Sequence, residues 1–247
     1  MKHQICRTVL AVAAVTAGVF LSACGLFRTP EDNVFDEAED AIATDSTASD
    51  IKTAQIEYEF GDGKTSTIRF QAPDNVRIDV LDGEDSAVFC LKDETGWMYV
   101  RGEVIDMTKD DVNEMYGALL QTIPFKVDFQ DIFMNAELQE ETEDACGEEC
   151  KVIKAVFREE PDTTAKLWIG KYTDLIRQFE VVREDGVYTM QYFDYATFDD
   201  VTLPSEMFRF SPEGATKLSL VSFETNIEIP ESVFQKPEQF SITEGDK

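Results

Sequence analysis

The sequence predicts an α+β fold organised around one curved antiparallel β-sheet. Between residues 55 and 100, and again between residues 164 and 210, apolar residues alternate with polar ones, which is typical of half-buried strands. Two other stretches, residues 30–42 and 108–120, repeat apolar residues every three or four positions and predict amphipathic helices. Short turn signals separate the predicted strands: Gly61-Asp62-Gly63, Asp82-Gly83 and Asp185-Gly186.

The start of the chain has the pattern of an export signal followed by a lipid-attachment cysteine. Lys2 and Arg7 precede an uncharged run over residues 8–20, and Leu21-Ser22-Ala23-Cys24 follows. This pattern resembles the signal of bacterial lipoproteins. We expect residues 1–23 to be removed and Cys24 to carry palmitate-type chains that anchor the protein in a membrane. The alternative is an uncleaved membrane helix, but a span needs about 20 apolar residues.

The composition of the remaining 224 of 247 residues excludes several classes of function. They carry a formal charge of −30, because the whole chain has −28 and Lys2 and Arg7 leave with the signal. A nucleic-acid partner is excluded, since phosphates are bound by clustered Lys and Arg. The only histidine is His3, so the mature chain lacks the histidine of nucleophilic triads and of common metal sites. We therefore expect no enzyme, no metal and no cofactor.

The first helix is predicted at Thr29-Pro30-Glu31-Asp32, which supplies an N-cap, a proline at the first position and acids in the first turn. Its apolar face would pack on the sheet or belong to a stalk, and we favour packing because Phe35 and Ile42 gain from burial. Residues 44–50 are rich in Ser, Thr and Asp and predict a loop. Residues 24–50 would thus form the lipidated N-terminus, first helix and linker, and residues 51–247 one folded domain.

A second helix is predicted from Thr108 and a third over residues 129–138, with a break at Pro124 between them. Their apolar residues either cover a cavity or fill a solid core. They are Val112, Met115, Leu119 and Leu120 in the second helix, and Ile132, Phe133 and Ala136 in the third.

The C-terminal part of the chain contains a weak repeat. Residues 201–208 and 227–234 each have two apolar residues, a proline and then a phenylalanine at the same spacing. Pro204 suits a strand end or an edge strand, because proline has no backbone N–H to donate. Residues 218–223 are also predicted as an edge strand.

Three cysteines remain in the mature chain. Cys146 and Cys150 are close in sequence, and export makes a disulfide between them plausible. A bond from Cys90 to either of them is the alternative. A metal site would need further soft ligands.

Several motifs resemble the LolA/LolB/LppX-like superfamily of envelope lipoproteins and lipoprotein carriers. The matching residues of the second half are Leu167-Trp168-Ile169, Leu175-Ile176-Arg177, Tyr192-Phe193-Asp194-Tyr195, Leu203-Pro204 and Phe208-x-Phe210-x-Pro212; those of the first half are Phe70, Pro73, Val76, Arg77, Ile78, Trp97 and Tyr99. The resemblance implies a strongly curved, incomplete barrel with helices covering its concave face. Ala72 stands where the carriers have an arginine before the proline, which argues against their energy-coupled shuttle cycle.

The expected function is therefore that of a lipid-anchored envelope protein that binds a lipid, an acyl chain or an acylated protein. Gly25 after the lipidated cysteine favours the outer membrane over the inner one. The alternative is an interaction or sensor module without a bound lipid. The candidate ligand-lining residues are apolar and mostly aromatic: Tyr58, Phe70, Phe89, Trp97, Tyr99, Leu119, Trp168, Phe179 and Tyr192. Sparse polar groups in an apolar pocket are usual for such sites.

Overall fold

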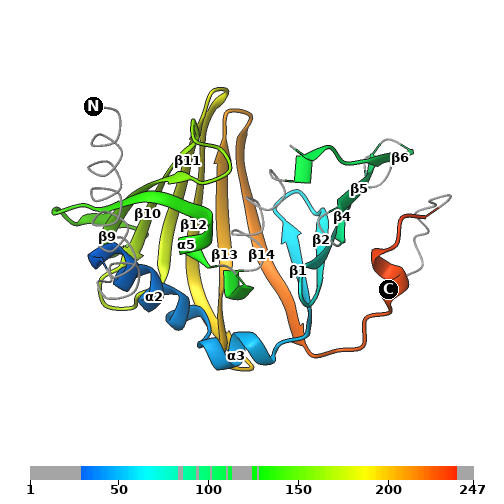
Figure 1. Cartoon of the computed structure of the whole chain (residues 1–247), viewed down its shortest axis with the longest axis horizontal. Coiled ribbons are helices and arrows are strands. Elements are labelled where there is room, and N and C mark those ends of the chain that lie inside the picture. The colour runs from blue at the N-terminus through cyan, green and yellow to red at the C-terminus, as the bar shows by residue number, and fades with distance from the viewer. Residues whose placement is uncertain are drawn as a thin grey trace, which may run out of the picture.

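The computed structural model describes residues 29–82, 86–92, 95–100, 102–109, 111–112, 124–126 and 128–237. The export signal, Cys24 and three residues of the predicted second helix (Met115, Leu119 and Leu120) lie outside this part of the chain. Figure 1 shows one large sheet with a few short helices along one side of it. Within the described part, no helix has both the length and the apolar character that crossing a membrane requires.

Fourteen antiparallel strands form the sheet, which confirms the predicted antiparallel sheet. The strand order is β6-β5-β4-β3-β2-β1-β14-β13-β12-β11-β10-β9-β7, and β8 pairs with β9 outside this path. Their bounds are β1 Thr53–Phe60, β2 Thr65–Gln71, β3 Asn75–Leu81, β4 Ala87–Lys92, β5 Thr95–Val100, β6 Glu103–Asp106, β7 Phe133–Leu138, β8 Glu143–Ala145, β9 Glu148–Phe157, β10 Thr164–Gly170, β11 Ile176–Arg183, β12 Gly186–Phe198, β13 Val201–Ser211 and β14 Gly214–Thr225.

The predicted strong curvature is not observed, because the sheet is neither closed nor strongly curled. In the described strand order, β6 and β7 lie at opposite ends. β6 has only four residues, and the pairing of β7 with β9 shifts between Met134 and Glu137. Neither end therefore offers the long, regular edge that barrel closure needs.

Helix α2 (Pro30–Ile42) starts as predicted. The Asp32 amide donates to Thr29 Oγ1 (3.3 Å), and the Thr29 amide donates to Asp32 Oδ2 (3.0 Å), which is a capping box. Val34, Phe35, Ala38 and Ile42 are buried against the sheet, so the helix packs and is not a stalk. The predicted loop over residues 44–50 was wrong: α3 (Asp45–Asp50) forms there, with the Thr44 side chain as its N-cap.

The third predicted helix is much shorter than expected. Helix α5 covers only Phe129–Ile132, and the chain then enters β7. The backbone of Phe133 is already extended, and Phe133 pairs with Phe157 of β9. An apolar run that is short can serve either a helix or a strand. Here β9 supplies the backbone partners that decide for a strand.

Two edge-strand predictions in the C-terminal part were also wrong, because both strands lie inside the sheet. Pro204 lies inside β13, and residues 218–223 lie in β14, which sits between β13 and β1. The proline is tolerated because β13 pairs with β14 only from Glu206 to Ser211. At Pro204 the described register gives β13 a partner on one side alone, the Tyr195 side.

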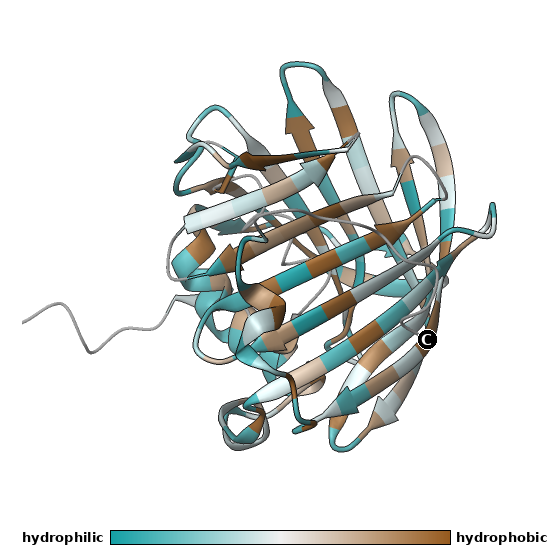
Figure 2. Ribbon diagram, turned by 90° about the vertical axis from the view of Figure 1, so that its right-hand side faces the viewer, coloured by the Kyte–Doolittle hydropathy of each residue, from teal (hydrophilic) through white to brown (hydrophobic). Residues whose placement is uncertain are grey.

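The sheet has two distinct faces. We call the face that contacts α2 the inner face and the opposite one the outer face. Along β10, Leu167 and Ile169 belong to the large cluster that includes α2, whereas Trp168 belongs to a separate cluster. Figure 2 shows this alternation of apolar and polar residues along the strands. The period of two in the sequence thus sorts side chains between faces.

Candidate apolar binding face

The inner face carries one continuous apolar cluster that crosses both halves of the sheet. Its strand members from the first half are Ala54, Ile56, Tyr58, Ile68, Phe70, Val76 and Leu91; those from the second half include Ile153, Leu167, Ile169, Phe179, Val181, Met190, Tyr192, Leu203, Met207 and Phe223. The predicted lining residues Tyr58, Phe70, Phe179 and Tyr192 therefore share this face. Phe89 packs against the same cluster and is half-buried.

One end of the inner face is filled by closely packed rings. Phe35 of α2 lies 5.4 Å from Phe129 and 6.0 Å from Phe133, between ring centroids. Phe133 in turn contacts Phe157 at 5.1 Å and Phe179 at 6.3 Å. Phe35 and Phe129 are each 1% exposed. This end is a solid core, so Phe179 serves packing there.

Helix α2 contacts β7, β13, α5 and the short 3-10 helix η2 (Pro124–Lys126). Away from these elements, the half-buried apolar side chains that pack on the same cluster include Ile78, Phe89, Leu218 and Leu220. They come from β3, β4 and β14, near the centre and the first half of the sheet. The region around these residues therefore combines apolar surface with partial exposure.

Two lysines lie at the border of this apolar region. The Nζ of Lys126 is 5.3 Å from the ring centroid of Phe70 and donates a hydrogen bond to the Ala48 carbonyl. The Nζ of Lys52 donates to the neighbouring Ser49 carbonyl at 2.5 Å. Burial, and then the nearby charge of Lys52, lower the pKa of Lys126. Neither lysine was among the site residues predicted from the sequence, although Lys126 follows Pro124-Phe125 in a very acidic chain.

Glu39 of α2 forms a hydrogen bond to α5. Its Oε1 accepts a hydrogen bond from the Phe129 amide at 2.7 Å. Burial raises the pKa of Glu39 to about 7, and the acids Asp128, Asp36 and Asp45 add to the rise, against the lowering effect of the Phe129 hydrogen bond. A carboxylate that titrates near neutral pH therefore lies in the contact between the two helices.

Three of the predicted lining residues lie on the outer face instead. Trp97 and Tyr99 belong to a cluster with Val88, Cys90, Ile229 and Phe234. Trp168 belongs to a cluster with Ala145, Cys150 and Val152. The register explains this, because Trp97 is opposite Cys90 and Trp168 is opposite Val152. These three residues therefore do not line the inner face, and Leu119 lies outside the described residues.

A different segment of the chain packs over each of the two outer clusters. Residues 227–236, which we call the C-terminal strap and which include the 3-10 helix η3 (Glu231–Phe234), cross β3 and β4. The Trp97 indole donates to the Phe234 carbonyl at 3.3 Å, and Arg77 donates to the Val233 carbonyl at 2.9 Å. The other cover is the β8–β9 hairpin, where the Trp168 indole donates to Glu143 at 2.8 Å.

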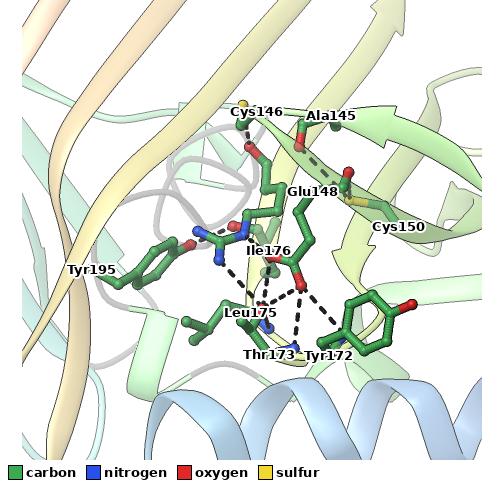
Figure 3. A network of polar contacts seen from close by, with 10 residues as sticks. Ala145, Cys146, Glu148, Cys150, Tyr172, Thr173, Leu175, Ile176 and Tyr195 are labelled. Carbon is green, nitrogen blue, oxygen red and sulfur yellow. Dashed lines mark hydrogen bonds and ion pairs between the residues drawn. The ribbon is translucent and has the colours of Figure 1, made fainter.

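A partly exposed polar network holds the turn between β10 and β11 (Figure 3). Arg177 Nε and Glu148 Oε2 are 2.6 Å apart, and Glu148 also accepts hydrogen bonds from the Thr173 amide and hydroxyl. Burial alone would raise the pKa of Glu148, but these contacts outweigh it and the pKa is lowered. A Cβ on Gly170 would lie 2.4 Å from Thr173 Oγ1 and 2.5 Å from Glu148 Oε1, so a larger residue there would displace these two side chains. These contacts hold Glu148 and Arg177 in place and fix the turn between β10 and β11.

Cys90, Cys146 and Cys150 are free in the structure, and a disulfide between Cys146 and Cys150 stays a prediction. Cys146 and Gly147 form a tight turn with φ of 48° and 83°. The Cys146 thiol donates to the Arg177 carbonyl at 3.1 Å, whereas the Cys150 thiol donates to the Glu148 carbonyl (Figure 3). Among the described residues, no group of three or more His, Cys, Asp or Glu side chains is arranged to hold a metal ion.

Comparisons with known proteins identify the fold. No protein-family model matches the chain, and no curated protein matches it significantly. A LolA superfamily protein from Nitrosomonas europaea has a similar structure with a TM-score of 0.57 and 12% identity, over 83% of this chain and 96% of that one. A domain from Vibrio parahaemolyticus that is assigned to outer-membrane lipoprotein sorting has a TM-score of 0.55 and 11% identity, over 82% and 96%.

A third similar structure is a DUF1329 family protein from Desulfovibrio piger, with a TM-score of 0.59 and 11% identity, over 84% of this chain and 98% of that one. The match in each case spans most of both chains, and the low identity restricts the conclusion to architecture. The chain has the fold of LolA superfamily proteins.

Proposed function

We propose that this protein is a lipid-anchored envelope lipoprotein that binds an apolar ligand on the inner face of its sheet. The observation that carries the proposal is the group of half-buried apolar side chains (Ile78, Phe89, Leu218 and Leu220) on a continuous apolar face. Burying apolar surface stabilises a complex by about 25 cal/mol per Å². An acyl chain laid along this region would bury both its own surface and these side chains.

The ligand class follows from the composition of the face. Its strands supply aliphatic and aromatic side chains, with few polar groups nearby. Such a surface selects by shape and apolar area, so lipids, free acyl chains and the acyl group of another lipoprotein all fit it. One similar structure is assigned to outer-membrane lipoprotein sorting, which agrees with this class.

The binding test is isothermal calorimetry of delipidated protein with saturated fatty acids of increasing chain length. Affinity should rise with length until the available inner face is covered, and the heat-capacity change should be negative. Phe89→Ser should weaken binding, whereas Val182→Ser, at a 41% exposed apolar side chain of β11, should not. Folded, ligand-free protein that gives no heat at any chain length would contradict the proposal.

The anchoring part has a separate test. Cys24→Ser should remove the attachment site for the lipid, so that the protein is recovered in the soluble fraction or retains residues 1–23. Two acyl chains are needed for stable anchoring. A Cys24→Ser protein that is processed normally and stays in the membrane would contradict it.

An interaction module is the second candidate, and the tips of two hairpins favour it. Val182, Val187 and Phe210 are 41%, 48% and 39% exposed. The β11–β12 and β13–β14 hairpins lie side by side at the top of Figure 1, and a Cβ on Gly186 would lie 2.4 Å from Pro212 Cγ. Loss of a partner from Val187→Ser/Phe210→Ser protein, together with no response to any lipid, would favour this function over lipid binding.

A further inference from the structure

Helix α3 brings two lysines together at the border of the inner face. Lys52 follows the helix and Lys126 ends η2, yet their ammonium groups donate to the adjacent carbonyls of Ser49 and Ala48. These carbonyls belong to the last turn of α3, where the helix dipole favours positive charge. Two cations that would otherwise repel each other are thus held in one place.

One of these cations also touches the apolar face directly. Lys126 Nζ lies 5.3 Å from the ring centroid of Phe70, which is 4% exposed. Its neighbour Phe125 is equally buried and contacts Phe223 of β14 with 5.5 Å between ring centroids. A positive group and an apolar surface therefore meet at this point, which is the arrangement that an amphiphile requires.

The charge of the two lysines is not neutralised by acids in the described structure. Seven lysines form ion pairs with carboxylates: Lys64, Lys92, Lys151, Lys166, Lys171, Lys217 and Lys236. Between described residues, Lys52, Lys109, Lys126 and Lys154 form none, and of these Lys52 and Lys126 share the last turn of α3. An ammonium group has three donors, and the carbonyl contact of each lysine uses one.

We propose that Lys52 and Lys126 bind the anionic head group of a single-chain amphiphile, a carboxylate or a phosphate, whose apolar chain lies along the inner face. This rests on the proposed function, since it assigns a head-group site to the same ligand. The carboxylate or phosphate oxygens accept hydrogen bonds from both ammonium groups, and the chain runs past Phe70 toward the half-buried residues of β3, β4 and β14. Charge-assisted hydrogen bonds of this kind are stronger than neutral ones.

The test compares three probes with the same apolar chain: dodecanoic acid, dodecyl phosphate and methyl dodecanoate. Calorimetry at neutral pH, below the aggregation concentration of each probe, should show that the acid or the phosphate binds about tenfold more tightly than the ester. The preferred one of the two anions identifies the head group. The anion preference should weaken with added salt, because the lysines are not fully buried.

The matched variants are Lys52→Gln/Lys126→Gln and, as a control, Lys64→Gln, which removes a lysine paired with Asp62 and Asp82. The double variant should bind the ester as the wild type does and lose the preference for the anions. The control should keep it. The single variants Lys52→Gln and Lys126→Gln, checked by circular dichroism, cover the case in which the double variant does not fold.

The outcomes separate this inference from the proposed function. Equal binding of acid, phosphate and ester by the wild type would overturn the lysine site and leave apolar binding intact. A preference for anions that persists in the folded lysine variants would also overturn it. If none of the three probes binds to folded, delipidated protein, both proposals fail.

Discussion

The inner and outer faces of this sheet are built from the same strands but bury their apolar residues in different ways. The outer face holds two small clusters, one beneath the C-terminal strap and one beneath the β8–β9 hairpin. Each contains a tryptophan whose indole N–H has a partner in the cover, Phe234 or Glu143. The inner face holds one continuous cluster, and α2 and α5 pack over only one end of it.

Aromatic content alone therefore does not identify a ligand-binding face. A tryptophan has an apolar body and a polar tip, so it needs a hydrogen-bond partner when it is buried. Both tryptophans find that partner in a small outer cluster that is already closed. The residues that stay half-buried on the inner face are mainly aliphatic, such as Leu218 and Leu220. Partial exposure on a continuous apolar face is the better indicator.

The largest effect is expected at the packed end of the inner face. Phe35→Ala removes a ring that contacts Phe129 and Phe133 and is 1% exposed. The free energy of unfolding should fall by about 3–5 kcal/mol, as for other buried phenylalanines. Urea denaturation followed by circular dichroism measures it. A loss below about 1 kcal/mol would show that α2 is not part of the folded core.

A smaller and more local effect is expected at the outer face. Phe234 is also fully buried, but we expect the strap to detach before the sheet unfolds, so Phe234→Ala should cost about 1–2 kcal/mol in global unfolding. Its main consequence should be at Cys90, which is 0% exposed beneath the strap and whose pKa burial raises to about 12.

Alkylation at neutral pH, mapped by mass spectrometry, should therefore label Cys90 faster in Phe234→Ala than in the wild type. The control is Gln235→Ala, an exposed neighbour in the same strap. Equal labelling rates in all three proteins would mean that the strap does not protect this cluster.

The smallest effect is expected at Glu39 and depends on pH. Because the pKa of Glu39 is raised to about 7 in the folded protein from 4.5, its protonated form favours folding; this contribution is complete below pH 4.5 and is lost as the pH rises through 7. Glu39→Gln should therefore match the wild type in acid and be more stable above pH 7. The carboxylate is partly exposed, so solvent screening keeps the gain below about 1 kcal/mol.

Thermal unfolding across this pH range measures the difference between Glu39→Gln and the wild type. Asp40→Asn, at an exposed position of the same helix, is the control and should show no such trend. A difference that stays constant from acid to neutral pH would contradict the assignment to Glu39.

Much of the fold was predictable because it depends on local signals. The alternation along β1 to β4 and β10 to β12, the cap of α2 and the Asp185-Gly186 hairpin all follow from spacing and turn chemistry. The run after Ile132 was not predictable, since its choice between helix and strand depends on pairing with β9. Neither was the position of Pro204, whose tolerance depends on where the pairing with β14 ends.

The weak repeat also shows that a local sequence pattern does not determine the structure that a segment adopts. Residues 201–208 lie in β13 inside the sheet, whereas residues 227–234 cross its outer face and end in η3. Similar patterns thus give different structures, because β12 offers the first copy a strand to pair with. The candidate site was predictable in part. Periodicity placed Tyr58, Phe70 and Tyr192 on one face, but which face the helices cover, and where Lys126 lies, depend on tertiary packing.

The most direct test of ligand binding at the inner face determines which face of the sheet an acyl chain contacts. Phe89→Trp places an indole at a half-buried inner position, while the native Trp97 and Trp168 stay on the outer face. A brominated fatty acid quenches only indoles that it touches. Binding at the inner face predicts strong saturable quenching in Phe89→Trp and little in the wild type, with equal affinities by calorimetry. Equal quenching of the two proteins, or quenching of the native tryptophans alone, would contradict binding at the inner face.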